Sequence, residues 1–223
     1  MDFPENRKKL SYVLKTVVVI AAVIGIVISA LGGKNSFMGG KVVLMYYTVQ
    51  SNIAIAAVCA LGMYLMHRNR NVHNVWFVVK FVMTVAITLT GVVFCLILAP
   101  TMGIAAWNIQ NILTHVVVPA AAIADLFVTG IYGDIRREHI IFITIPPLLY
   151  VIYAGIGFIC NWQFGFGHNY PYFFLNWGSP LGVFGLSGQF PFMGTVWWIL
   201  LLLAFLLVVG RLYVSVLDRL KAR

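Results

Sequence analysis

The chain has 223 residues, of which 61% are hydrophobic and only 9% are charged. A soluble domain carries about 25% charged residues. A chain with so few charged residues cannot cover a surface that faces water, so a soluble domain is excluded. The net charge of +9 does not indicate nucleic-acid binding, because the basic residues stand at the edges of apolar runs rather than among exposed aromatics. We therefore expect an all-α integral membrane protein that forms one transmembrane domain over residues 1–223.

Six apolar runs are each long enough to cross a hydrocarbon core of about 30 Å as a helix. They cover residues 11–31, 42–66, 74–98, 107–131, 139–160 and 195–217. Turn or charge signals separate the runs, including Pro100 and the segment 133–138. A cleavable signal peptide is the competing interpretation of the first run, although six uncleaved spans fit the distribution of charge.

The positions of Lys and Arg predict the orientation of the helices. With a cytoplasmic N-terminus, 13 of the 15 basic residues fall on the cytoplasmic side, and only Lys34 and Lys41 fall outside. The positive-inside rule then predicts that both termini are cytoplasmic, and we expect a multi-pass protein of the plasma membrane. Lys15, Lys80 and Arg211 are expected near inner helix ends, where long side chains reach the headgroups.

The segment 161–193 between the fifth and sixth runs has an unusual composition. It contains no charged residue but six glycines, three prolines and eleven aromatic residues. A structureless loop of this length in water would be more polar. We expect an uncharged aromatic lid or re-entrant segment at the outer interface, where Trp and Tyr prefer to lie.

Polar side chains recur on one face of the second run and on one face of the fourth. They are Thr48, Ser51 and Asn52 in the second run, and Asn108, Asn111 and His115 in the fourth. Helical rise places Thr48 about 9 Å and His115 about 12 Å inside the outer ends of their runs, so the two side chains can meet. A hydroxyl that faces an imidazole in a water-poor pocket is the minimum for an activated nucleophile.

Prolines and tyrosines surround the same depth of the membrane. Pro119 lacks the N–H that would bond to the His115 carbonyl, which predicts a kink and a free acceptor beside the imidazole. The proline pair at 146–147 is expected to break the fifth run near its middle. Tyr150 and Tyr153 follow this pair and are expected to reach the same cavity.

Asp125 is the acidic residue that lies deepest in an apolar run. It follows His115 by ten residues, or about 15 Å of helix, so it does not orient the imidazole. We expect a structural role in which Asp125 pairs with Lys80, Arg211 or a tyrosine. The three cysteines are isolated and show no metal-binding spacing, and we expect neither a metal nor another cofactor.

The same polar residues have simpler interpretations. Thr and Ser often bond to carbonyls of their own helix. Asn and His also join neighbouring helices in membranes without any chemistry. Binding of an ion or a small substrate is a third interpretation of the two polar faces.

Several short motifs resemble those of the androgen-induced protein family, which includes the androgen-dependent regulator of tissue factor pathway inhibitor and bacterial six-span proteins. The second-run motif comprises Tyr47, Thr48, Gln50, Ser51 and Asn52. The fourth-run motif comprises residues 111–115 with Pro119 and Asp125, and the aromatic motif comprises Tyr150, Tyr153 and residues 170–175. The similarity spans residues 45–176 and looks closer to the bacterial branch, because the spacing of the proline after the histidine departs from the mammalian pattern.

Mammalian members of that family are threonine hydrolases that split fatty acid esters of hydroxy fatty acids with one threonine and one histidine. The resemblance therefore implies that Thr48 is the nucleophile and His115 the base. We predict an intramembrane hydrolase of lipid esters whose site opens toward the outer leaflet. Asn52 or Asn111 would stabilise the oxyanion, and Ser51 would help to bind the acyl substrate. The alternatives are a transporter or channel for a small or lipidic solute, and a non-catalytic receptor or scaffold.

Overall fold

The computed structural model describes residues 4–32, 39–68, 72–187 and 193–222. Six helical spans in these ranges are long and apolar enough to cross a membrane, which confirms the predicted number of spans. The spans are Glu5–Leu31, Tyr47–His67, Asn74–Ala106, Ile109–Tyr132, Arg137–Ile159 and Thr195–Lys221. Lys34, Arg70 and Arg223, which contribute to the predicted orientation, lie outside the described residues.

The first, second and sixth spans are single α-helices, and the other three are built from shorter helical pieces. The single helices are α1 (Glu5–Leu31), α2 (Tyr47–His67) and α8 (Thr195–Lys221). The third span joins α3 (Asn74–Val93), the π-helix η2 (Phe94–Leu98), α4 (Ala99–Met102) and the 3-10 helix η3 (Gly103–Ala106). The fourth joins α5 (Ile109–Ile112), the π-helix η4 (Leu113–Val117), α6 (Val118–Thr129) and the 3-10 helix η5 (Gly130–Tyr132). The fifth joins the 3-10 helix η6 (Arg137–Thr144) and α7 (Ile145–Ile159).

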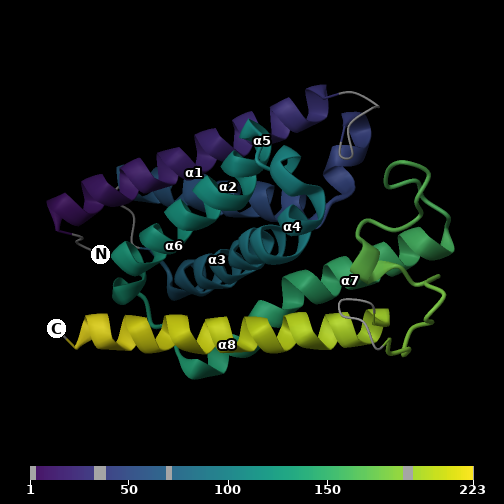
Figure 1. The fold of residues 1–223 in the computed structure, drawn as a ribbon. Helices are drawn as coiled ribbons and strands as arrows, with labels where there is room; N and C mark the ends of the chain where they lie inside the picture. Colours follow the sequence, from purple (N-terminus) through teal and green to yellow (C-terminus); the bar gives the residue numbers. More distant parts are fainter. Residues whose placement is uncertain (1–3, 33–38, 69–71, 188–192, 223) are drawn as a thin grey trace.

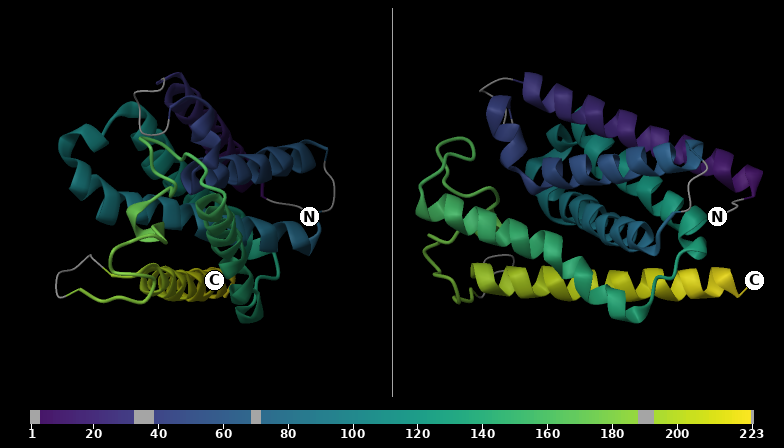
Figure 2. Two further views of the ribbon diagram at one scale, coloured as in Figure 1. Left: turned by 90° about the vertical axis from the view of Figure 1, so that its right-hand side faces the viewer. Right: turned by 180° about the vertical axis from the view of Figure 1, so that it is seen from behind.

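The helix α3 lies in the middle of the bundle, with α1, α2 and α6 on one side and α7 and α8 on the other (Figures 1 and 2). The two chain termini lie at one end of the bundle, and the segment 160–187 lies at the opposite end (Figure 1). Large apolar side chains such as Leu149 and Leu212 are exposed on the outer helices. An exposed apolar surface of this kind suits contact with lipid.

Two predicted boundaries differ from the structure. The second run begins at residue 42 in the sequence prediction, but α2 begins at Tyr47, because Tyr46 is extended and separates it from the 3-10 helix η1 (Gly40–Met45). Thr48 therefore stands in the first turn of its helix rather than about 9 Å inside it. The predicted break at Pro100 is wrong, since this proline lies in the first turn of α4, where its missing N–H does no harm. The chain turns instead at Gly103, whose φ of 65° is costly for other residues.

The proline pair at 146–147 coincides with a change of helix type. The 3-10 helix η6 ends at Thr144, and the prolines stand in the first turn of α7. The helices α7 and α8 cross near this junction and then diverge toward the segment 160–187 (Figures 1 and 2). Residues of both helices line the pocket described below.

A buried cluster of charges joins α1, α3 and α6. The Asp125 carboxylate accepts bonds from Lys15 Nζ at 2.8 Å and Ser11 Oγ at 2.6 Å, and it lies 2.5 Å from Lys80 Nζ. Both ammonium groups also lie over the Trp76 ring, at 5.6 Å and 5.3 Å from its centroid. The expectation that Lys15 and Lys80 reach the headgroups is wrong, because both side chains are buried. They point inward and pair with a carboxylate that has no access to water.

We predict that Asp125→Asn lowers the stability of the folded bundle by about 3–5 kcal/mol, because it leaves two buried ammonium groups without a counter-charge. Thermal unfolding in detergent, followed by tryptophan fluorescence, measures the change. The control is Asp134→Asn, which removes the same charge from an exposed ion pair with Arg136 and should leave the midpoint unchanged. Equal midpoints for the two variants would contradict the stabilising role of the cluster.

Candidate functional site

The two π-helices meet at the candidate site. Phe94 begins η2, and His115 lies in the middle of η4. The two rings stack, with centroids 4.0 Å apart and an angle of 24° between the planes. A π-helical turn carries an extra residue and is frequent at functional sites, because it turns side chains away from the direction that a regular helix gives them. Both π-turns therefore set the position of the imidazole.

The hydrogen bonds of His115 define its tautomer. Nδ1 lies 3.0 Å from the backbone carbonyl oxygen of Asn111, which can only accept a hydrogen bond. It also lies 3.0 Å from the Thr114 hydroxyl, which donates its own proton to the Gln110 carbonyl at 2.8 Å. Nδ1 therefore carries the proton of the neutral ring, and Nε2 keeps a lone pair.

The lone pair of His115 faces Thr48. The distance from Thr48 Oγ1 to His115 Nε2 is 3.4 Å, and both side chains are buried. This separation is long for a hydrogen bond, but catalytic contacts often shorten when substrate binds. The arrangement supplies a hydroxyl, a neutral base and a fixed acceptor behind the base, which are the elements of nucleophilic catalysis.

The neighbours of Thr48 fix its helix against η4. Asn52 donates from Nδ2 to the Thr48 carbonyl at 2.7 Å and to the Thr114 carbonyl at 3.2 Å. Ser51 donates to the Thr48 carbonyl at 3.0 Å and lies 2.8 Å from the Thr90 hydroxyl. These side chains hold the backbone on which the Thr48–His115 contact depends.

The structure does not place the two predicted asparagine donors beside the hydroxyl of Thr48. Both N–H groups of the Asn52 amide are directed at backbone carbonyls. The Asn111 amide donates to the Ala106 carbonyl at 2.8 Å, and the Asn111 backbone N–H bonds to the Asn108 side chain at 3.0 Å. These bonds cap the N-terminus of α5. Asn111 therefore contacts His115 through its backbone carbonyl and not through its side-chain amide.

Pro119 takes part in a close helix contact, while the kink expected there stays a prediction. Pro119 lies in the first turn of α6, directly after η4. The His115 carbonyl, which receives no N–H from Pro119, lies against Gly91 of α3. A Cβ at position 91 would come within 2.8 Å of that carbonyl oxygen and 3.2 Å of the proline ring. Gly91 therefore permits the approach that holds η4 in place.

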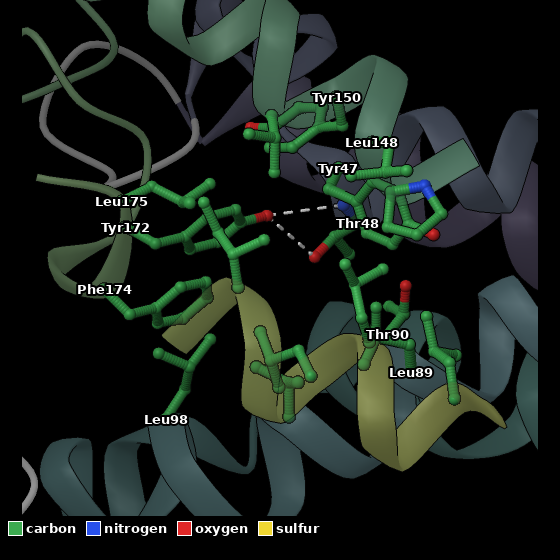
Figure 3. A pocket seen from close by; sticks show the side chains of 17 residues that line it. Tyr47, Thr48, Leu89, Thr90, Leu98, Leu148, Tyr150, Tyr172, Phe174 and Leu175 are labelled. Carbon is green, nitrogen blue, oxygen red and sulfur yellow. Dashed lines mark hydrogen bonds between the residues drawn. The ribbon is translucent and has the colours of Figure 1, made fainter. Parts of the chain in front are cut away.

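A pocket of about 640 Å³, counted to its open mouth, lies beside Thr48 between α3, α7 and α8 (Figure 3). Its lining is almost entirely apolar and includes no charged side chain; the polar lining residues are Tyr47, Thr48, Thr90, Tyr150 and Tyr172. The pocket suits the apolar part of a ligand, such as a hydrocarbon chain.

The two tyrosines expected at the cavity lie differently. Tyr150 lines the pocket and donates its hydroxyl proton to the Met45 carbonyl at 3.0 Å. Tyr153 does not line it, and its ring packs on Tyr150 with centroids 5.8 Å apart. Asp125 belongs to the separate charge cluster described above.

Sequence reasoning missed the contact of Tyr172 with Thr48. The Tyr172 hydroxyl lies 3.4 Å from both Thr48 Oγ1 and Thr48 N (Figure 3). The ring is held in place because it stacks on Phe174 at 5.0 Å and lies edge-on to Tyr46 at 5.7 Å. The signal in the sequence was the uncharged aromatic segment, which predicts a lid but does not say which of its side chains reaches the pocket.

Within the described ranges, no group of three His, Cys, Asp or Glu side chains is arranged to hold a metal ion. No known protein family, curated protein or solved structure matches the chain. The resemblance drawn from the short motifs therefore stays a prediction, and the site is interpreted from its geometry.

We predict that Gly91→Ala destabilises the protein by about 1–3 kcal/mol, because the added methyl group collides with backbone at His115 and cannot be absorbed by a flexible side chain. The matched control is Gly155→Ala in α7, where the nearest atoms lie 4.0 Å from the new Cβ. That change should keep or slightly raise the thermal midpoint in detergent, because alanine favours a helix over glycine. A Gly91→Ala variant as stable as this control would contradict the close contact.

Proposed function

We propose that the protein is an intramembrane hydrolase of lipid esters, with Thr48 as nucleophile and His115 as general base. The observation that carries this proposal is the approach of Thr48 Oγ1 to His115 Nε2 at the edge of an apolar pocket. The Asn111 carbonyl behind Nδ1 supports the role of the imidazole, since it orients the ring and stabilises the positive charge that develops there.

The chemistry needs only these groups, an ester and water. Nε2 takes the proton from Thr48 as Oγ1 attacks the acyl carbon, and the alcohol leaves with that proton. Water then attacks the acyl-threonine in the same way, with Nε2 again accepting a proton. Collapse of the second intermediate releases the fatty acid and returns the proton to Oγ1.

The substrate class follows from the pocket and the membrane. An uncharged lining favours an uncharged acyl chain, and a pocket lined by residues of α7 and α8 suits a substrate that arrives from the bilayer. The positive-inside rule supports cytoplasmic termini, which would put the pocket toward the outer leaflet of the plasma membrane. The motif resemblance supports esters of the fatty acid–hydroxy fatty acid type.

Purified protein in detergent is expected to hydrolyse a palmitate ester of a hydroxystearic acid. Thr48→Val, which keeps the shape of the side chain but removes the hydroxyl, should abolish turnover. His115→Gln should lower kcat by about 10²–10⁴-fold, the usual contribution of general-base catalysis. Release of free fatty acid, measured by mass spectrometry, gives the rates.

The matched control is Thr84→Val, which removes a buried hydroxyl that bonds only to the Lys80 carbonyl of its own helix. It should hydrolyse the ester at the wild-type rate. If wild-type protein is silent, or Thr48→Val is as active as wild type, the hydrolase proposal fails. Solute flux in proteoliposomes would then test the transporter alternative.

A further inference from the structure

We propose that the oxyanion of this reaction is bound by two donors that face Thr48 Oγ1: the backbone N–H of Thr48 and the phenol of Tyr172. The inference rests on the proposed hydrolase function, and it assigns a catalytic role to the segment that follows α7. It replaces the asparagine amides, whose N–H groups are directed at backbone carbonyls.

The Thr48 N–H is available because α2 begins one residue earlier. The first N–H groups of a helix have no carbonyl partner within that helix. The next two N–H groups, of Val49 and Gln50, both reach the Tyr46 carbonyl at 3.1 Å. The Thr48 N–H points instead at the Tyr172 oxygen at 3.4 Å. The positive end of the α2 dipole at this position favours a negative charge.

The Tyr172 phenol is the second donor. Its ring is buried and lines the pocket, and its oxygen is as close to Thr48 Oγ1 as to Thr48 N. Burial raises the pKa of this phenol above its ordinary value of 10.0, so it stays protonated and neutral at physiological pH. A neutral phenol donates to a developing oxyanion without repelling it.

The present contacts are weak enough to be exchanged for bonds to a substrate. Both distances from Tyr172 to Thr48 are long for hydrogen bonds, so little energy is lost when the phenol and the N–H turn to a carbonyl oxygen instead. Tyr150, whose hydroxyl also belongs to the pocket, donates its proton to the Met45 carbonyl. Tyr47 lines the pocket with a hydroxyl that has no hydrogen-bond partner among the described residues, and it is the competing donor.

Acylation forms one bond to the acyl carbon and breaks another. Oγ1 forms a bond to the acyl carbon, its proton passes to His115 Nε2, and the carbonyl π electrons move to the oxygen that the two donors hold. When the intermediate collapses, those electrons re-form the carbonyl. The bond to the alkoxy oxygen breaks, and that oxygen takes the proton from Nε2.

The test compares wild type with Tyr172→Phe on p-nitrophenyl butyrate in detergent. Phenylalanine keeps the ring that packs on Phe174 and Tyr46, so the fold is retained. Loss of one oxyanion donor should lower kcat about 10²–10³-fold with KM within about threefold. The affinity for a trifluoromethyl ketone, whose adduct with Thr48 carries the same oxyanion, should fall by a similar factor. The control Tyr213→Phe removes a hydroxyl bonded to Thr88 outside the pocket and should match wild type.

The outcomes separate this inference from the hydrolase proposal. An active wild type whose Tyr172→Phe variant keeps its kcat overturns the role of Tyr172 and leaves the hydrolase proposal standing. A large loss in Tyr47→Phe with little loss in Tyr172→Phe likewise overturns it in favour of the neighbouring phenol. A wild type that hydrolyses no ester overturns both proposals.

Discussion

Hydrocarbon offers no hydrogen-bond partners, so each polar group within the spans must find its partner in the chain itself. The clearest response is the cluster in which one carboxylate, Asp125, pairs with two lysines from two other helices. A partner removed from such a cluster leaves a charge that neither water nor lipid can accommodate. The relative positions of α1, α3 and α6 depend on this cluster, and η4, which continues into α6, carries His115.

The same constraint shapes the site. Asn52 and Ser51 satisfy the Thr48 carbonyl, and Asn111 provides the carbonyl that fixes the His115 tautomer. A backbone carbonyl here takes the place that a carboxylate occupies in serine-type triads, where it orients the imidazole. The carbonyl is uncharged, so it orients the ring without placing another negative charge in the apolar interior.

The sequence was sufficient for some of this arrangement. Six long apolar runs required six helices, because each span must satisfy its own backbone hydrogen bonds. The polar faces around Thr48 and His115 predict that the two side chains lie close together, since such faces avoid lipid. The prediction places Thr48 too deep because it starts the helix too early, yet the two side chains are adjacent, with His115 on the π-turn η4.

Other features depend on packing that a pattern does not contain. Lys15 and Lys80 stand near helix ends, where reaching the headgroups is the common outcome, but rotation of each helix is set by its neighbours. The amide of Asn111 closes the start of a helix because the chain turns at Gly103, which the periodicity did not reveal. Tyr172 reaches Thr48 through an irregular segment, and no periodicity specifies the direction of a side chain there.

The proposed hydrolase mechanism requires that Thr48 form a covalent acyl intermediate. The most direct measurement is rapid acid quench of the protein during turnover of a p-nitrophenyl ester, followed by peptide mass spectrometry. We predict one acyl group on the peptide that contains Thr48, attached to its side chain and absent from Thr48→Val. An acyl group on a different residue, or steady turnover with an unmodified Thr48 peptide under conditions where deacylation is slow, would contradict it.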